Sequence, residues 1–75
     1  MLTLKQARAS RFLTVRALAE KAGVAPSTVY LTESGRSTPR FAIIEKLSTA
    51  LEVNPNEIVE FVAAIERAGS PVRRS

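Results

Sequence analysis

The sequence predicts an all-α protein, and two kinds of observation carry this prediction. Helix start signals recur along the 75 residues, most clearly at Thr38-Pro39 and Asn54-Pro55, where a capping residue precedes a proline suited to the first helical position. Between such signals, apolar residues recur at intervals of three and four, which is the spacing of an amphipathic helix. A chain of this length holds one domain with a small core.

The centre of the chain is predicted to form two short helices joined by a tight turn. Thr14 is a suitable N-cap for a helix over residues 15–22. Gly23 follows that helix at the position that commonly requires a positive φ angle. Pro26 then opens a second helix, which extends to Glu33. This arrangement is a helix, a turn and a second helix held at a fixed angle.

Three further helices surround this central pair. They are expected over about residues 3–11, from Thr38-Pro39 to about residue 51, and from Asn54-Pro55 to about residue 68. Glu57 is placed to complete a capping box at the start of the last helix. Gly35 lies in the loop after the helix that ends at Glu33 and is expected to cap the C-terminus of that helix.

The charges of the chain are unevenly distributed. Residues 1–40 hold seven basic and two acidic side chains, whereas residues 41–69 hold two basic and five acidic ones. A basic half joined to an acidic half is typical of a domain with a phosphate-binding face and a separate association face. Small domains also carry uneven charge by chance, so composition alone leaves both interpretations open.

Several classes of function are excluded or disfavoured by what the sequence lacks. It has no cysteine and no histidine, which removes disulfides, thiolate metal sites and histidine acid–base chemistry. It also lacks a glycine-rich phosphate loop, so we expect no enzyme, no metal and no cofactor, and no small-molecule ligand is evident. The longest apolar run, residues 61–65, is too short to span a bilayer, and a cytoplasmic protein without membrane contact is expected.

Many small and apolar positions in register resemble the phage-repressor-like (Cro/Xre type) helix-turn-helix proteins. The central positions are Ala19, Gly23, Val24, Val29, Glu33, Gly35 and Pro39, and the outer ones are Leu4, Arg8, Leu47, Ala50, Leu51, Val53 and Glu57. The resemblance covers about residues 3–60. It implies a compact five-helix, lambda-repressor-like domain over residues 1–69, with its helix-turn-helix formed by the second and third helices, and a flexible basic tail over residues 70–75. Such proteins bind double-stranded DNA, usually as homodimers.

The third helix is the candidate recognition helix, because the N-terminal part of such a helix reaches base edges. The base-contact candidates are Pro26, Ser27, Thr28, Tyr30 and Leu31. None of them is Arg, Asn or Gln, the residues that make bidentate base contacts, so direct readout is expected to be weak. Tyr30 and Leu31 could instead cover a neighbouring helix or a protein partner.

The phosphate-contact candidates flank the recognition helix. They are Thr14, Arg16, Arg36, Ser37 and Arg40. The resemblance places basic side chains and helix N-termini near this loop against the DNA backbone, and a helix N-terminus favours anions in its own right. Val15 departs from the family, which often has a phosphate-contacting glutamine at that place.

The resemblance also implies a structural ion pair between Arg8 and Glu33, which would tie the first helix to the third. The alternative is that both are ordinary surface charges. Phe12 stands where the family usually has glycine, so the link between the first two helices is expected to differ in shape.

The last helix carries an apolar arc wider than one packing contact needs. We expect part of it to form a dimer interface made of Ile58, Phe61, Val62 and Ile65, with Phe61 as the central anchor. The alternative is that Phe61 belongs to the core of its own chain. The function expected from all these features is a sequence-specific transcriptional regulator, a repressor or autoregulator, bound as a homodimer to a two-fold operator. The alternative is a protein-interaction module on the same fold with weak or lost base readout.

Overall fold

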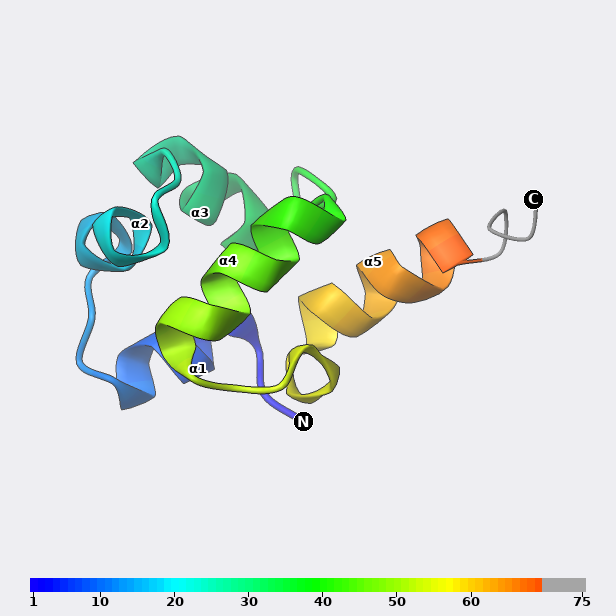
Figure 1. Cartoon of the computed structure of the whole chain (residues 1–75), viewed down its shortest axis with the longest axis horizontal. Coiled ribbons are helices and arrows are strands. Elements are labelled where there is room, and N and C mark those ends of the chain that lie inside the picture. Colours follow the sequence, from blue (N-terminus) through cyan, green and yellow to red (C-terminus); the bar gives the residue numbers. More distant parts are fainter. Residues whose placement is uncertain (70–75) are drawn as a thin grey trace.

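A computed structural model describes residues 1–69 and confirms the all-α fold (Figure 1). Its elements are α1 Leu4–Ser10, α2 Val15–Ala22, α3 Pro26–Glu33, α4 Phe41–Leu51, the 3₁₀ turn η1 Pro55–Glu57, and α5 Val59–Gly69. The predicted tail over residues 70–75 lies outside the described residues. Helix α4 crosses the middle of the molecule, α2 and α3 lie on one side of it, and α5 extends on the other (Figure 1).

The helix-turn-helix begins and ends where the local signals predict. The Thr14 hydroxyl accepts a hydrogen bond from the Ala17 amide at 3.0 Å and caps α2. Gly23 has φ 75° and ψ 34°, a left-handed conformation that suits glycine. The Val24 amide then donates to the Ala19 carbonyl at 3.0 Å, which closes the turn and directs the chain into α3.

All five helices contribute to one apolar core. Its completely buried members are Leu4, Leu18, Ala19, Val29, Leu47, Leu51, Ile58 and Phe61. Ala19 lies where α2 packs against α3, and its small side chain permits their close approach. The orientation of α3 therefore depends on its packing against α2 and α1.

Helix α4 begins later than its sequence signal predicts. Thr38 and Pro39 were expected to cap and open it, but it starts at Phe41, with Arg40 in an extended conformation as N-cap. The Thr38 hydroxyl accepts a hydrogen bond from Arg67 Nη1 at 3.0 Å, so α5 occupies the side chain that was expected to cap α4. This prediction was wrong because the competing partner is distant in sequence.

The predicted start of the last helix was also wrong. Asn54 caps only the short turn η1, and its side chain accepts from the Asn56 amide at 3.0 Å instead of forming a capping box with Glu57. Ile58 is extended, at φ −110° and ψ 121°, and makes an isolated parallel β-bridge with Leu2. An extended residue cannot continue a helix, so α5 starts afresh at Val59.

The β-bridge fastens the N-terminal residues to the start of α5. The Leu2 amide donates to the Glu57 carbonyl at 2.9 Å, and the Val59 amide donates to the Leu2 carbonyl at 2.8 Å. Two residues later, the Leu4 amide donates to Glu60 Oε1 at 2.8 Å. A carboxylate is thus held at the N-terminus of α1, where it is also favoured by the helix dipole.

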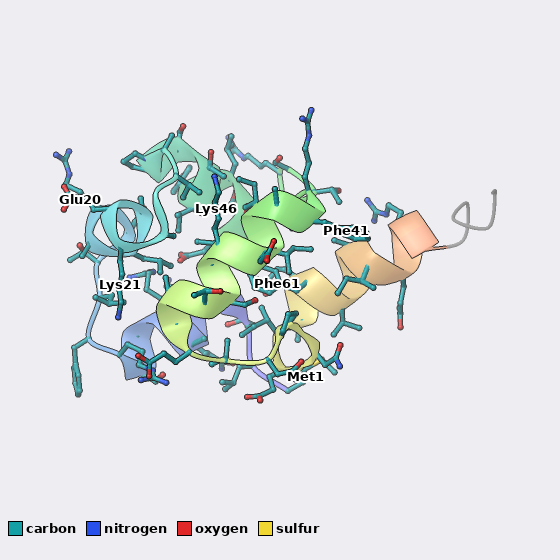
Figure 2. The ribbon with its side chains drawn as sticks, viewed as in Figure 1. Met1, Glu20, Lys21, Phe41, Lys46 and Phe61 are labelled. Carbon is teal, nitrogen blue, oxygen red and sulfur yellow. The ribbon has the colours of Figure 1, made fainter. Side chains whose placement is uncertain are left out.

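Two of the four residues predicted for the dimer interface are buried in the core of their own chain. Ile58 and Phe61 are both 0% exposed, and Phe61 lies among the helices of the bundle (Figure 2). The prediction that Phe61 anchors a dimer was therefore wrong, because its side chain has no surface left for a partner. Val62 and Ile65 are half-buried and keep part of their surface.

The link between α1 and α2 is shaped by a residue in an unfavourable conformation. Phe12 has φ 57° and its side chain is 95% exposed. A left-handed conformation costs a non-glycine residue about 1 kcal/mol or more, and Phe12 gains no packing in return. Phe12 is also the residue from which the sequence analysis expected this link to differ in shape.

Arg8 and Glu33 form the predicted ion pair, which joins α1 to the end of α3. Arg8 Nε donates to Glu33 Oε2 at 2.6 Å and Nη2 donates to Oε1 at 3.1 Å, while Nη1 donates to the Leu13 carbonyl at 2.8 Å. The hydrogen bond to Glu33 raises the pKa of the Arg8 guanidinium. Because the pKa of Arg8 is higher in the folded chain than in the unfolded chain, the pair contributes its full stability at every pH below the pKa of the unfolded state. This contribution is therefore constant around neutral pH.

We expect Arg8→Ala to lower the free energy of unfolding by about 2–3 kcal/mol, because it leaves the largely buried Glu33 carboxylate without its partner. The matched control is Arg11→Ala, which breaks the exposed Arg11–Glu52 pair at 3.5 Å and should cost less than about 0.5 kcal/mol. Urea unfolding followed by circular dichroism measures both. Equal effects of the two changes would show that the buried pair has no special role.

Phe12→Gly should raise the free energy of unfolding by about 1 kcal/mol, since glycine adopts the left-handed conformation without strain and no packing is lost. Phe12→Ala is the control, because alanine removes the exposed ring but keeps the strain. Thermal unfolding of the two variants distinguishes backbone strain from the ring. Equal stability of both variants would contradict the strain argument.

Candidate nucleic-acid interface

Helix α3 has one buried face and one exposed face. Val29 and Thr32 are buried against the bundle, whereas Pro26, Ser27 and Tyr30 are exposed. Tyr30 keeps 57% of its surface accessible, so it does not serve to cover a neighbouring helix of this chain. Three of the five base-contact candidates are therefore free to meet a ligand.

The other two base-contact candidates, Thr28 and Leu31, are half-buried at the edges of this face. The Thr28 carbonyl accepts a hydrogen bond from the buried Thr32 hydroxyl at 2.8 Å. A threonine inside the bundle thus satisfies its hydroxyl within its own helix, as a buried polar group requires. Thr32 is therefore buried without leaving its hydroxyl unpaired.

The loop after α3 presents three of the phosphate-contact candidates. Gly35, at φ 77°, turns the chain, and the Arg36 amide donates to the Leu31 carbonyl at 3.0 Å. This glycine lies one residue beyond the C-cap Ser34. Arg36, Ser37 and Arg40 are all exposed along the loop.

A surface hollow brings residues of α3 and this loop together. Its volume is about 280 Å³, and its walls include Thr28, Ser37 and Arg40. One base-contact candidate and two phosphate-contact candidates, separated by nine or more positions in the sequence, thus line the same depression. The structure does not place Thr14 and Arg16 there, since they lie at the start of α2, on the other side of α3 (Figure 1).

Helices α3 and α4 begin without a capping side chain, unlike α1 and α2, which are capped by Thr3 and Thr14. Their N-cap residues are Ala25, which has no side-chain acceptor, and Arg40, which can only donate. The first-turn amides of both helices therefore receive no acceptor from a cap. Such amides favour an external anion such as phosphate.

The sequence analysis had placed helix N-termini against the DNA backbone but had not identified the absence of their capping side chains. The signal was present at Ala25, a poor capping residue directly before Pro26. At Arg40 it was hidden, because Thr38-Pro39 is the better local start signal.

The arginines of this face are not neutralised by acidic neighbours. Among residues 1–69 the salt bridges are Arg8–Glu33 and Arg11–Glu52, so Arg16, Arg36 and Arg40 take part in none there. All three are exposed. The positive potential of the face is therefore available to a charged ligand.

Neither a metal site nor a membrane-spanning helix is found in the described part of the chain. Residues 1–69 contain no group of three or more acidic, histidine or cysteine side chains placed to hold a metal ion. Within the same residues, the apolar stretches of all helices fall short of a membrane span.

Comparison with known proteins agrees with this geometry. A sequence model described as a helix-turn-helix domain matches residues 2–61, which include α1 to α4 and the start of α5. Comparisons with curated proteins and with solved structures gave no match. The match agrees with the resemblance to the phage-repressor-like (Cro/Xre type) proteins, and the chain belongs to the helix-turn-helix domain family.

Proposed function

We propose that this protein is a sequence-specific DNA-binding transcriptional regulator, a repressor or autoregulator that acts from a two-fold operator. The observation that carries the proposal is a single face that combines the exposed N-terminus of α3, helix starts without a capping side chain, and arginines that form no salt bridge within residues 1–69. These features offer base edges and phosphates separate partners on one face. Membership of the helix-turn-helix family supports DNA as the ligand.

In this proposal the N-terminal turn of α3 enters the major groove. Pro26 and Ser27 lead, Tyr30 lies one turn behind, and Thr28 and Leu31 flank them. Hydroxyl groups can donate to or accept from a base edge, and apolar side chains can pack against thymine methyls. Sequence selection then comes from a few contacts, supplemented by DNA shape.

The phosphate contacts fix the position of α3 on the duplex. Arg36, Ser37 and Arg40 contact the backbone on one side of α3, and Thr14 with Arg16 contacts it on the other. The first-turn amides of α4 add neutral donors to a phosphate. Binding of this kind falls steeply with salt, because each neutralised phosphate releases counterions.

A protein-interaction module is the second candidate function, and Val15 favours it. Valine cannot donate to a phosphate, and α3 offers no side chain for a bidentate base contact. A salt titration on the promoter of the protein's own gene and on random DNA separates the two. Preference for the promoter supports a regulator, and equal or absent binding supports the interaction module.

Arg36→Ala and Arg40→Ala should each weaken binding to specific and random DNA alike, because phosphate contacts carry no sequence information. Each should reduce the slope of log affinity against log salt by roughly 1. Lys5→Ala, at an exposed basic residue of α1 outside α3 and the loop that follows it, is the control and should leave the slope unchanged. Fluorescence anisotropy at several salt concentrations measures this, and a change of sequence preference without a change of slope would refute the assignment.

Ser27→Gln should change the preferred base at one position of each half-site, since glutamine can bond adenine in a bidentate manner. Ser34→Gln, at the opposite end of α3, is the matched control and should leave the preference intact. Selection from a randomised DNA library reads out both variants. If Ser27→Gln left the selected site unaltered, the N-terminal turn of α3 would not be the reading element.

A further inference from the structure

The loop between α3 and α4 has two parts that are held in different ways. In its first part, residues 34–36, all three backbone amides donate hydrogen bonds to carbonyls of α3. Its second part, residues 37–39, makes no backbone hydrogen bond with any other residue of the described chain. This second part leads directly to Arg40. Its conformation therefore sets where Ser37 and Arg40 stand on the candidate interface.

A single hydrogen bond from α5 reaches this second part. Arg67 Nη1 donates to the Thr38 hydroxyl at 3.0 Å, across 29 positions of the sequence. Within residues 1–69, residues 37–39 take part in no other hydrogen bond. Arginine stays protonated in proteins, so this bond is charge-assisted and stronger than one between two neutral groups.

The packing around this bond is incomplete. Two surface hollows, of about 150 and 380 Å³, are both lined by Thr38, Pro39 and Arg67. The smaller hollow also reaches Thr32 of α3, and the larger one reaches Arg40. Open space beside the loop means that few neighbouring atoms press on it. A segment with few contacts and few hydrogen bonds opens locally at low cost, so the bond from Arg67 matters more here than it would in a packed loop.

We propose that Arg67 is a positioning residue for the contact loop, residues 37–40. Through the Thr38 hydroxyl it holds this loop in the conformation in which Ser37 and Arg40 can both reach a phosphate. A loop that is mobile before binding must be ordered during binding, and this ordering lowers affinity. Arg67 removes part of that cost, because the loop is already ordered in the free protein. Helix α5 thus takes part in DNA binding without touching DNA.

The use of this bond rests on the proposed DNA binding, but the bond itself belongs to the free chain and is tested there first. Amide heteronuclear NOE values of Ser37, Thr38 and Arg40 should be similar to those of α4 in the wild-type protein. They should fall in Arg67→Ala and in Thr38→Val, whereas the values of α4 stay unchanged. Thr38→Ser keeps the hydroxyl and should keep the wild-type values. Equal values in the wild type and in Arg67→Ala would overturn the proposal.

DNA affinity then tests the positioning role. Thr38→Val removes the acceptor at almost constant shape and charge, so it should weaken binding about fivefold without changing the salt slope. Arg67→Ala removes the same bond and should weaken binding by a similar factor. The double variant should bind no more weakly than either single variant, because all three lack the same interaction. Thr38→Ser should bind like the wild type.

Two matched controls account for the lost charge and the lost hydroxyl. Lys5→Ala removes a positive charge from an exposed residue of α1, and Thr49→Val removes an exposed threonine hydroxyl from α4. Neither residue hydrogen bonds to the contact loop within residues 1–69. Both variants should bind DNA like the wild type and keep the wild-type NOE values of the contact loop.

A direct phosphate contact by Arg67 would give a different result. Arg67→Ala would then reduce the slope of log affinity against log salt by roughly 1, and its effect would add to that of Thr38→Val. Additive effects would overturn the positioning role. An unchanged affinity of Thr38→Val would also overturn it, because the contact loop would then bind equally well without the bond.

The two measurements separate this inference from the proposed function. Suppose that the wild type shows no preference for its own promoter over random DNA, while the contact loop still loosens in Arg67→Ala. The regulator is then refuted and the link between Arg67 and the loop is retained. Specific binding by the wild type, with a contact loop that stays rigid in Arg67→Ala, would retain the regulator and refute the role of Arg67.

Discussion

The ion pair between Arg8 and Glu33 is the constraint on which the placement of α3 depends. It joins the first helix of the bundle to the last residue of α3, and the same guanidinium reaches the Leu13 carbonyl in the link before α2. Three segments are therefore held by one side chain. The apolar contacts of Val29 and Ala19 fix the depth of α3 in the bundle, whereas this planar, directional pair fixes its end. Rigid placement matters because a helix that reads DNA must present its side chains at set positions.

The helices of the motif could be predicted from sequence because their boundaries are set locally. Thr14 and Gly23 act on neighbours within four residues, and the ends of α2 and α3 coincide with these signals. The errors arose where a distant residue competes with a local signal. Ile58 is drawn into an extended conformation by Leu2, which is 56 positions away, and Thr38 is engaged by Arg67. Neither partner can be found from the spacing of apolar residues or from capping preferences.

The association surface shows a different limit of sequence analysis. A helical wheel shows that Phe61 faces inward from α5, but it does not tell whether the neighbour is the same chain or another one. The structure assigns Phe61 to the core and leaves Phe41, the first residue of α4, at the surface. Charge patterning had indicated an acidic half apart from the basic face, and Glu45 and Glu52 belong to it.

The uncapped starts of α3 and α4 also have a consequence for folding. A missing cap leaves a helix terminus less stable by about 1 kcal/mol, so the free protein frays most readily at the two places that would meet phosphate. An anion bound there would supply the missing acceptors and tighten both first turns. Ordering of these two helix starts and binding of an anion to them would then be one coupled equilibrium, so that a bound nucleic acid would stabilise the folded state.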